Sequence, residues 1–457
     1  MSSYAIAVER LHALGQELAH SPSALPGTPG STRRKFDLDQ MRLLADALGH
    51  PERKFRSVLI AGTNGKGSTA ATLASILQAG GYRTGLYTSP HLTRVNERIQ
   101  IGGVPITDDD FARLYFQVEE VGAQLAGAGK LPQHPSFFET ITAMAFLYFA
   151  EQKVDMAVLE VGMGGRLDAT NIVEPLLSVI TDISIDHTEW LGPTLTDIAH
   201  EKAGILRPSG VLVTLSQHPE ANQVLGEVAM ELGVTGVDAA RYLPPLDAAA
   251  WSASYPVTIL DKTVELTPPL AGTHQHRNVA LAVATAVELC NRYGYKLTAE
   301  ALATGVRTTR WPGRLERFTL SAEQPEILLD VAHNPAGAWT LRSALSALPQ
   351  HGPRTLVFGC MHDKPVTELV QILFPIFDRV ILTSANSPRA ASVEELLAAA
   401  VTVGAQATMA ESPLQGLQEA LSSTPATGLV VVSGSIYLVG PVREYLMQSM
   451  HAGQALR

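Results

Sequence analysis

The chain has 457 residues, of which 46% are hydrophobic and 17% are charged, and its formal net charge is −10. This composition is typical of a globular protein with two domains rather than of a disordered chain. The acidic balance argues against nucleic-acid partners, and no apolar run approaches the roughly 20 residues that cross a bilayer.

The first residues, MSSYAIAVERLHALGQEL, have helical periodicity with charges inside it, so they do not resemble a secretory signal. The chain has two cysteines, Cys290 and Cys360, which show neither metal-ligand spacing nor a disulfide framework. We therefore expect a cytoplasmic protein. The next stretch, SPSALPGTPGSTRR at 21–34, is rich in proline, glycine and serine and predicts an exposed loop.

Short apolar runs then alternate with helical patterns. Helices are expected at 68–80, 137–152 and 278–294. The predicted strands are SVLIAG at 57–62, TGLYTS at 84–89, DMAVLEVG at 155–162, LLSVITDIS at 176–184 and GVLVTLS at 210–216. Their residues are apolar consecutively rather than alternately, as in a parallel sheet that is covered by helices on both faces.

The segment TTRWPGRLERF at 308–318 predicts a linker, because Trp311-Pro312-Gly313 would halt a helix. Beyond it the alternation resumes. The strands expected there are EILLDVAH, RTLVFGC, DRVILTSA and GLVVVSGS. We therefore expect an α/β protein with two domains, at 1–307 and 319–457.

The stretch GTNGKGST at 62–69 lies between a predicted strand and a predicted helix. Glycines allow backbone N–H groups to surround a phosphate, and a helix start adds a positive dipole end. Lys66 would supply a charge to that phosphate, although it precedes the second glycine instead of following it as in the common phosphate-loop pattern. The alternative is a glycine-rich turn without a ligand.

The stretch LEVGMGGRLDATN begins at the end of another apolar strand. An ionised Glu160 there is costly unless a cation or hydrogen bonds compensate it. Three glycines follow, which let the backbone approach a partner closely, with Arg166 and Asp168 beside them. A functional site is favoured over a structural turn.

Asp186 and His187 follow the next buried strand, in SIDHTEWLG. A carboxylate with a neutral imidazole can hold Mg²⁺, which usually keeps water and substrate oxygens besides. Taken alone, His187 is better explained as a residue that caps a turn. Lys202 lies on a predicted helix, where a lone lysine is most often solvated.

In the second half, Asp330 and His333 follow a predicted strand, and an aspartate there can accept hydrogen bonds from a ribose. The alternative is a helix start, because Asn334-Pro335 is also a good N-terminal cap. Lys364 and Ser433 also follow strands and could bind an anionic substrate.

These segments occur in an order that resembles the folylpolyglutamate synthase family, including its bacterial bifunctional members that are also dihydrofolate synthases. The motifs that carry the resemblance are GTNGKGS, YTSPHL, SFFE, LEVGMGGRLDATN, DHTEWLG, HEKAGI, HQHRN, WPGR, LDVAHNP and MHDK. Mur ligases share the fold and the phosphate loop but resemble the chain less, because SFFE, GGRLDATN and DHTEWLG are features of the folate branch.

The resemblance implies a P-loop ATPase-like domain with a mostly parallel sheet, followed by a smaller Rossmann-like domain that ligates glutamate. It also implies an ATP-binding set: Gly65, Lys66, Gly67, Ser68, Asn278, Arg314 and Asp330. Two Mg²⁺ sites are implied, with Ser89, Glu160 and His187 as ligands. Lys202 matches a lysine that the family carries as a carbamate made with CO₂, and with Lys66 and His187 it forms the implied catalytic set.

The same resemblance implies a pterin side and an amino-acid side. The pterin side comprises Asp37, Leu38, Asp39, Ser136, Phe137, Phe138, Glu139, Leu167, Asp168 and Ala169. His333, Lys364 and Ser433 lie on the side of the incoming amino acid. The chain departs from the family's usual pattern in a longer loop before the pterin segment, in Asp39 in place of a common glycine, and in Pro365 after Lys364.

The implied activity is an ATP-dependent amide ligase that adds L-glutamate to a folate or to dihydropteroate through an acyl phosphate. The resemblance also suggests a monomer. Two alternatives remain open: a Mur-type ligase with a UDP-sugar substrate, and a P-loop kinase or ATPase that needs no amino acid.

Overall fold

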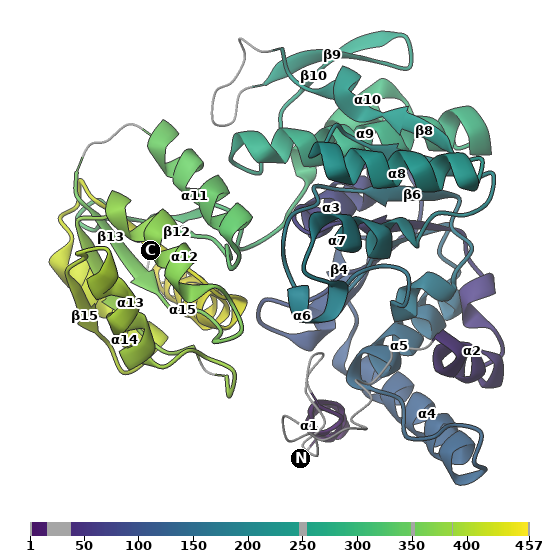
Figure 1. The fold of residues 1–457 in the computed structure, drawn as a ribbon, viewed down its shortest axis with the longest axis horizontal. Coiled ribbons are helices and arrows are strands. Elements are labelled where there is room, and N and C mark those ends of the chain that lie inside the picture. Colours follow the sequence, from purple (N-terminus) through teal and green to yellow (C-terminus); the bar gives the residue numbers. More distant parts are fainter. Residues whose placement is uncertain (1, 16–37, 246–253, 349–351, 386, 456–457) are drawn as a thin grey trace.

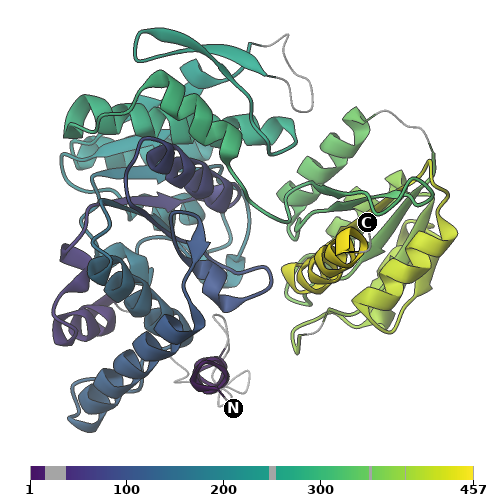
Figure 2. The same cartoon turned by 180° about the vertical axis from the view of Figure 1, so that it is seen from behind.

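The computed structural model describes residues 2–15, 38–245, 254–348, 352–385 and 387–455, and they form two domains that lie side by side (Figures 1 and 2). The predicted loop at 21–34 and Asp37 lie outside the described residues. No helix in the described part of the chain is long and apolar enough to cross a membrane.

The first domain is built on a sheet of eight strands within the described residues, in the order β4-β3-β2-β5-β1-β6-β7-β8. The pairs from β2 to β8 are parallel, and β3 and β4 add an antiparallel edge. The strands are β1 (Ser57–Ala61), β2 (Thr84–Tyr87), β3 (Ile99–Ile101), β4 (Val104–Pro105), β5 (Met156–Glu160), β6 (Leu177–Ile180), β7 (Val211–Thr214) and β8 (Thr235–Asp238). A separate hairpin comprises β9 (Tyr255–Ile259) and β10 (Lys262–Leu266).

Helices cover both faces of this sheet, as the consecutive apolar residues predict. Along β1, Leu59 and Ala61 pack in one core with α1, α2, α4, α5, α7 and α8, while Val58 and Ile60 pack in another with α3, α9 and α10. The helices are α1 (Ser3–Ala13), α2 (Leu38–Ala47), α3 (Lys66–Ala79), α4 (Asp108–Gly127), α5 (Phe137–Glu151), α6 (Thr188–Leu191), α7 (Leu195–Ala203), α8 (Pro219–Glu231), α9 (Thr273–Tyr293) and α10 (Ala299–Thr308). Short 3₁₀ turns are η1 (Pro51–Arg53), η2 (Val95–Arg98), η3 (Ala169–Ile172) and η4 (Ala239–Tyr242).

The second domain has a six-stranded sheet in the part of the chain that the structure describes, in the order β11-β12-β16-β13-β14-β15. Only the β11–β12 pair among these described pairs is antiparallel. Its elements are β11 (Glu316–Phe318), β12 (Glu326–Leu329), α11 (Pro335–Ala347), β13 (Arg354–Phe358), α12 (Val366–Leu373), η5 (Phe374–Ile376), β14 (Arg379–Leu382), α13 (Val393–Thr402), β15 (Ala407–Met409), α14 (Pro413–Ser423), β16 (Leu429–Ser433) and α15 (Ile436–Ala455). Helices α11 to α13 pack on one face and α14 and α15 on the other.

The linker between the domains is shorter than 308–318. Helix α10 ends at Thr308, and Glu316–Phe318 forms β11, which pairs with β12. The sequence reading missed β11 because a three-residue strand carries too little periodicity to be recognised. The connection therefore comprises residues 309–315 and includes the Trp-Pro-Gly turn.

Candidate active site

The glycine turn after β1 has the backbone geometry of a phosphate loop. Gly62 has φ 150° and Gly65 has φ 89°, and helix α3 begins directly after Gly65. The Lys66 ammonium lies over the turn and donates to the carbonyl oxygens of Gly62 at 3.1 Å and Thr63 at 3.2 Å. The turn therefore brings the backbone N–H groups at the start of α3 and the Lys66 charge close together, as an anion site requires.

The glycines of this turn are needed because other parts of the chain approach it closely. A Cβ atom on Gly65 would lie 2.2 Å from Oδ1 of Asn278, and one on Gly67 would lie 2.6 Å from Cζ2 of Trp311. Asn278, on α9, is among the predicted ATP-binding residues, and Trp311 belongs to the linker. The loop is therefore held from two sides.

Glu160 ends β5, the strand beside β1, and its residue is 4% exposed. Burial raises the pKa of its carboxyl to about 7, against the opposing effect of the Lys66 charge. The backbone N–H of Ser89 donates to Oε2 of Glu160 at 3.2 Å. Two of the predicted metal ligands are thus in contact at the ends of β2 and β5, with Lys66 in electrostatic range.

His187, the third predicted ligand, adopts a left-handed conformation with φ 52°. Burial lowers the pKa of its imidazole to about 3, and the Lys66 charge contributes in the same direction. At neutral pH the ring is uncharged and its lone pair can serve as a metal ligand. Glu160 and His187 therefore both lie within electrostatic range of Lys66.

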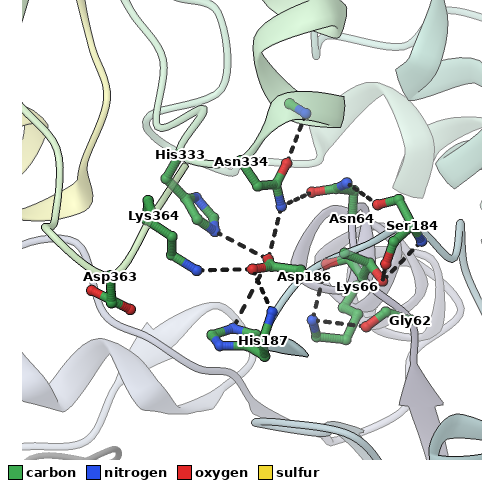
Figure 3. A network of polar contacts seen from close by, with 12 residues as sticks. Gly62, Asn64, Lys66, Ser184, Asp186, His187, His333, Asn334, Asp363 and Lys364 are labelled. Carbon is green, nitrogen blue, oxygen red and sulfur yellow. Dashed lines mark hydrogen bonds and ion pairs between the residues drawn. The ribbon is translucent and has the colours of Figure 1, made fainter. Parts of the chain in front are cut away.

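Asp186 is a point of contact between the domains (Figure 3). Its Oδ1 accepts from Nζ of Lys364 at 2.9 Å, and its Oδ2 accepts from Nδ2 of Asn334 at 2.9 Å. Burial raises the pKa of Asp186, but at the acidic pH where this carboxyl titrates, positive charge at His187, Lys364 and His333 outweighs burial, so the net pKa is lowered. Because burial lowers the pKa of His187 to about 3 and that of His333 to about 4, both rings are uncharged at neutral pH, and Lys364 is the cation that acts there.

Lys202 is buried, which corrects the expectation of a solvated side chain. Its residue on α7 is 3% exposed, and its Nζ donates to the carbonyl oxygen of Gly62 at 2.8 Å. Burial, followed by the charge of Lys66, lowers the pKa of its ammonium to about 7. The solvation rule failed because α7 packs its lysine against the glycine turn, a contact between residues 140 positions apart.

Asp330 and Arg314 lie together where the second domain begins. The Asp330 carboxylate accepts from the backbone N–H groups of Leu315 at 3.0 Å and Ala332 at 2.9 Å. Burial raises the pKa of Asp330 and lowers that of Arg314, although each charge partly stabilises the other. Arg314 also acts on Glu160, so it lies in electrostatic range of the first domain's site.

The residues predicted to bind the incoming amino acid, His333, Lys364 and Ser433, have different surroundings. Lys364 is engaged by Asp186, and His333 places Nε2 4.0 Å from the same carboxylate. Ser433, at the end of β16, is fully buried, and its hydroxyl has no hydrogen-bond partner among the described residues. Lys364 and His333 thus share the Asp186 carboxylate as a partner, and the Ser433 hydroxyl does not hydrogen-bond to it.

Several predicted pterin residues have structural roles. Ser136 caps α5, and Glu139 completes a capping box by accepting from the backbone N–H of Ser136 at 2.8 Å. The ring of Phe138 lies so close that a Cβ on Gly162 would be 2.5 Å from it, and Phe137 carries the Arg98 guanidinium over its ring. The approach of Phe138 to Gly162 ties the start of α5 to the glycine-rich loop.

Asp168 holds the glycine-rich loop in place through hydrogen bonds to its backbone. Its buried carboxylate accepts from the backbone N–H groups of Gly162 at 2.9 Å, Met163 at 3.1 Å and Thr170 at 3.0 Å. Burial raises the pKa of this carboxyl to about 6, against those hydrogen bonds. Its neighbours in the predicted set are half-buried Leu167 and buried Ala169.

Two further predicted pterin residues lie on α2 and differ in their burial. Leu38 is buried at its start, whereas Asp39 lies at the surface and pairs with Arg42 one turn on.

Sequence reasoning missed Arg277. It treated Asp186 as a possible metal holder and Asn334 as a possible helix cap, and it did not predict the contact between the domains that these two residues make. Arg277 binds the Asp182 carboxylate through Nε and Nη2, and the Asp182 carbonyl accepts from the backbone N–H groups of Thr63 and Asn64. Arg277 thereby supports the glycine turn. Its place in HQHRN, next to Asn278, was the available signal.

Comparison with known proteins matches both domains to one ligase class. The family models "Mur ligase middle domain" and "Mur ligase, glutamate ligase domain" match residues 60–286 and 313–436. The chain is 36% identical over 420 residues to a dihydrofolate synthase/folylpolyglutamate synthase of Bacillus subtilis, covering 90% of this chain and 95% of the relative. Over 413 residues it is 32% identical to the protein of the same description from Escherichia coli, covering 90% and 91%.

Solved structures agree over nearly the whole length. Folylpolyglutamate synthase of Mycobacterium tuberculosis complexed with ADP has a TM-score of 0.83 at 32% identity, with 97% and 99% of the two chains covered. E. coli FolC in complex with DHPP and ADP has a TM-score of 0.81 at 30% identity, with 98% of each chain covered.

The fold and the site define an ATP-dependent ligase of the Mur ligase class. Within that class, the chain belongs to the folylpolyglutamate synthase/dihydrofolate synthase family.

Proposed function

We propose that this enzyme forms an amide bond between L-glutamate and the carboxylate of a folate, and also accepts dihydropteroate. The observation that carries the proposal is the Lys66 ammonium on the glycine turn, with Glu160 and His187 both in electrostatic range of it. In the first step, an acceptor carboxylate oxygen attacks the γ-phosphorus of ATP and ADP leaves. In the second, the glutamate amine attacks the acyl carbon and expels phosphate.

The chain's own residues supply position and charge. Backbone N–H groups at 65–68 and the Lys66 ammonium would bind the phosphates, and Asn278, Arg314 and Asp330 would contact the nucleoside and phosphate side. Because both reactants are anions, neutralising their charge and fixing their geometry would provide most of the rate enhancement. Closure of the domains would exclude water, which otherwise hydrolyses an acyl phosphate.

The residues Ser89, Glu160 and His187 fit a Mg²⁺ ion. The buried Glu160 carboxyl has a pKa raised to about 7 by burial, so a cation beside it would stabilise the carboxylate. The His187 imidazole, with its pKa lowered to about 3, is neutral at neutral pH. Mg²⁺ usually also takes water and substrate oxygens as ligands, so phosphate oxygens of ATP would complete its coordination. When bound, Mg²⁺ neutralises charge on the β- and γ-phosphate oxygens.

Lys202 fits the proposed carbamate, which would serve a second Mg²⁺ site. Its amine must be uncharged to attack CO₂, and a pKa of about 7 leaves a large neutral fraction at neutral pH. The attack forms an N–C bond and releases a proton. The product is a carboxylate beside the turn that Lys66 spans.

The acceptor and amino-acid sites are proposed at the two edges of this centre. The pterin would lie along the start of α2, the start of α5 and the loop at 167–169. Lys364, His333 and Ser433 would face the glutamate. We also propose a cytoplasmic monomer, in keeping with two free cysteines in the described chain.

The test is ADP release that depends on L-glutamate. Lys66→Ala and His187→Ala are expected to lose it while remaining folded, whereas the exposed-residue controls Lys130→Ala and His134→Ala keep it. Unchanged turnover in the first two variants would refute the site assignment.

The acceptor separates the remaining alternatives. Turnover with both dihydropteroate and a tetrahydrofolate supports the bifunctional assignment, and turnover with a UDP-sugar acceptor alone would indicate a Mur-type ligase. ATP hydrolysis or phosphoryl transfer without any need for an amino acid would indicate a kinase or ATPase.

A further inference from the structure

A chain of polar contacts runs from the phosphate loop to the second domain (Figure 3). The Asn334 amide donates to Oδ1 of Asn64 at 3.2 Å and to Oδ2 of Asp186 at 2.9 Å. The Asn64 amide in turn donates to the Ser184 hydroxyl at 3.2 Å. Asn334 belongs to the second domain and the other three to the first, so this chain of contacts depends on how the domains are placed.

A nearly buried ion pair between Lys364 and Asp186 also joins the two domains. Lys364 and Asp186 lie 2.9 Å apart, with 8% and 9% of their side chains exposed. Breaking such a pair on one side leaves a charge uncompensated in a poorly solvated place, which costs far more than breaking a surface pair. The surface pair of Lys262 and Glu300, 3.1 Å apart and 64% and 61% exposed, is a contrast within the same chain.

Asp186 also fixes the residue that follows it. Its Oδ1 accepts from the backbone N–H of His187 at 2.9 Å, and this is the oxygen that Lys364 approaches. His187 has a left-handed backbone, which a non-glycine residue adopts at a cost unless its surroundings hold it. Oδ1 of Asp186 therefore holds both the backbone of His187 and the side chain of Lys364.

Asn334 extends the contact to a helix. Its side-chain oxygen accepts from the backbone N–H of Gly337 at 2.8 Å and caps α11, while its amide group faces the first domain. The start of α11 is thereby tied to Asn64, which lies between Gly62 and Lys66 in the phosphate loop.

We propose that Asp186 is a positioning residue that holds the two domains closed and aims Lys364 at the amino-acid substrate. The second half of this inference rests on the proposed function, because it takes glutamate as the substrate near Lys364. The first half concerns domain placement alone.

The kinetic test is a double-mutant cycle on Asp186→Asn and Lys364→Met. Each single variant is expected to raise KM for L-glutamate about tenfold, and the double variant is expected to be no worse than the poorer single variant, because Asp186 acts on the glutamate through Lys364. Glu300→Gln, which breaks the surface pair, serves as the matched control and should leave KM unchanged. Additive effects, or an Asp186→Asn KM equal to that of the control, would overturn the proposal.

Small-angle X-ray scattering tests domain placement without turnover. Asp186→Asn is expected to have a larger radius of gyration than the wild-type chain, and Glu300→Gln the same one. Equal radii for all three would overturn the first half of the inference. A wild-type chain that ligates no glutamate would refute the proposed function, while the scattering result would still decide the placement.

Asn334→Ser gives a second variant in case Asp186→Asn does not fold. Serine is also a good helix cap, so α11 keeps its start, but the shorter side chain loses both contacts across the domains. The same direction of change in KM and radius is expected. No change in either would count against the proposal.

Discussion

Replacing Gly305 by alanine is expected to push α10 away from α3, the helix that begins at the phosphate loop. A Cβ atom on Gly305 would lie 2.3 Å from Cα of Ile76 and 2.9 Å from the carbonyl oxygen of Ser75. These are backbone atoms, so no side chain can rotate aside. Reaching the 3.4 Å of ordinary contact requires a relative shift of roughly 1 Å between the helices.

The size of the effect follows from two opposing contributions. Overpacking of a tight core costs about 1–3 kcal/mol, and a backbone contact belongs at the upper end of that range. Alanine in place of a helical glycine stabilises the helix by about 1 kcal/mol. The free energy of unfolding is therefore expected to fall by about 2 kcal/mol, and KM for ATP to rise as α3 and Lys66 are displaced.

Gly226 offers a matched control. It lies on α8, and a Cβ there meets nothing within 4 Å. Gly226→Ala should raise the free energy of unfolding by up to about 1 kcal/mol, so the two variants should differ by about 3 kcal/mol. Equilibrium urea unfolding measures both. Equal stability of the two variants would refute the reasoning from close packing.

Three further changes test other parts of the account. Ser136→Ala removes the cap of α5 and should lower the free energy of unfolding by about 1 kcal/mol in urea titrations; no loss would show that the capping box is not needed. Burial raises the pKa of Asp168 in the folded state to about 6, so the protonated carboxyl favours folding. Its contribution to the free energy of unfolding is present below about pH 4 and is lost as the pH rises through 6. The stability of the wild type relative to Asp168→Asn should therefore fall by about 2 kcal/mol from pH 4 to pH 7, and a rise would contradict the burial argument. With ¹³C-labelled bicarbonate, the wild type should give a carbamate carbonyl signal in ¹³C NMR that Lys202→Arg lacks, and an equal signal in both would place the modification elsewhere.

Apolar runs sufficed to predict the strands that carry the site. Strands β1, β5 and β13 are buried at every residue, as consecutive apolar residues require. Because parallel strands end at one edge of the sheet, polar residues at their carboxyl ends come together there. Glu160 ends β5 and Ser89 follows β2, and the two residues are in contact.

What the sequence could not provide was contact between distant segments. Nothing in HEKAGI distinguishes a buried Lys202 from a solvated one, because its burial depends on how α7 packs against residue 62. The pair of Asp186 and Lys364 joins residues 178 positions apart, in two domains. Local periodicity carries no information about either distance, whereas the N-cap role of Asn334 is local and was predicted.

The central claim is that the glycine turn, Lys66, Glu160 and His187 direct an acceptor carboxylate onto ATP. The most direct measurement uses an acceptor whose carboxylate carries ¹⁸O, with ATP and L-glutamate, followed by mass spectrometry of the inorganic phosphate. Passage through an acyl phosphate transfers one labelled oxygen from each acceptor carboxylate to the phosphate released. Phosphate without the label, formed while glutamate is joined to the acceptor, would contradict the account.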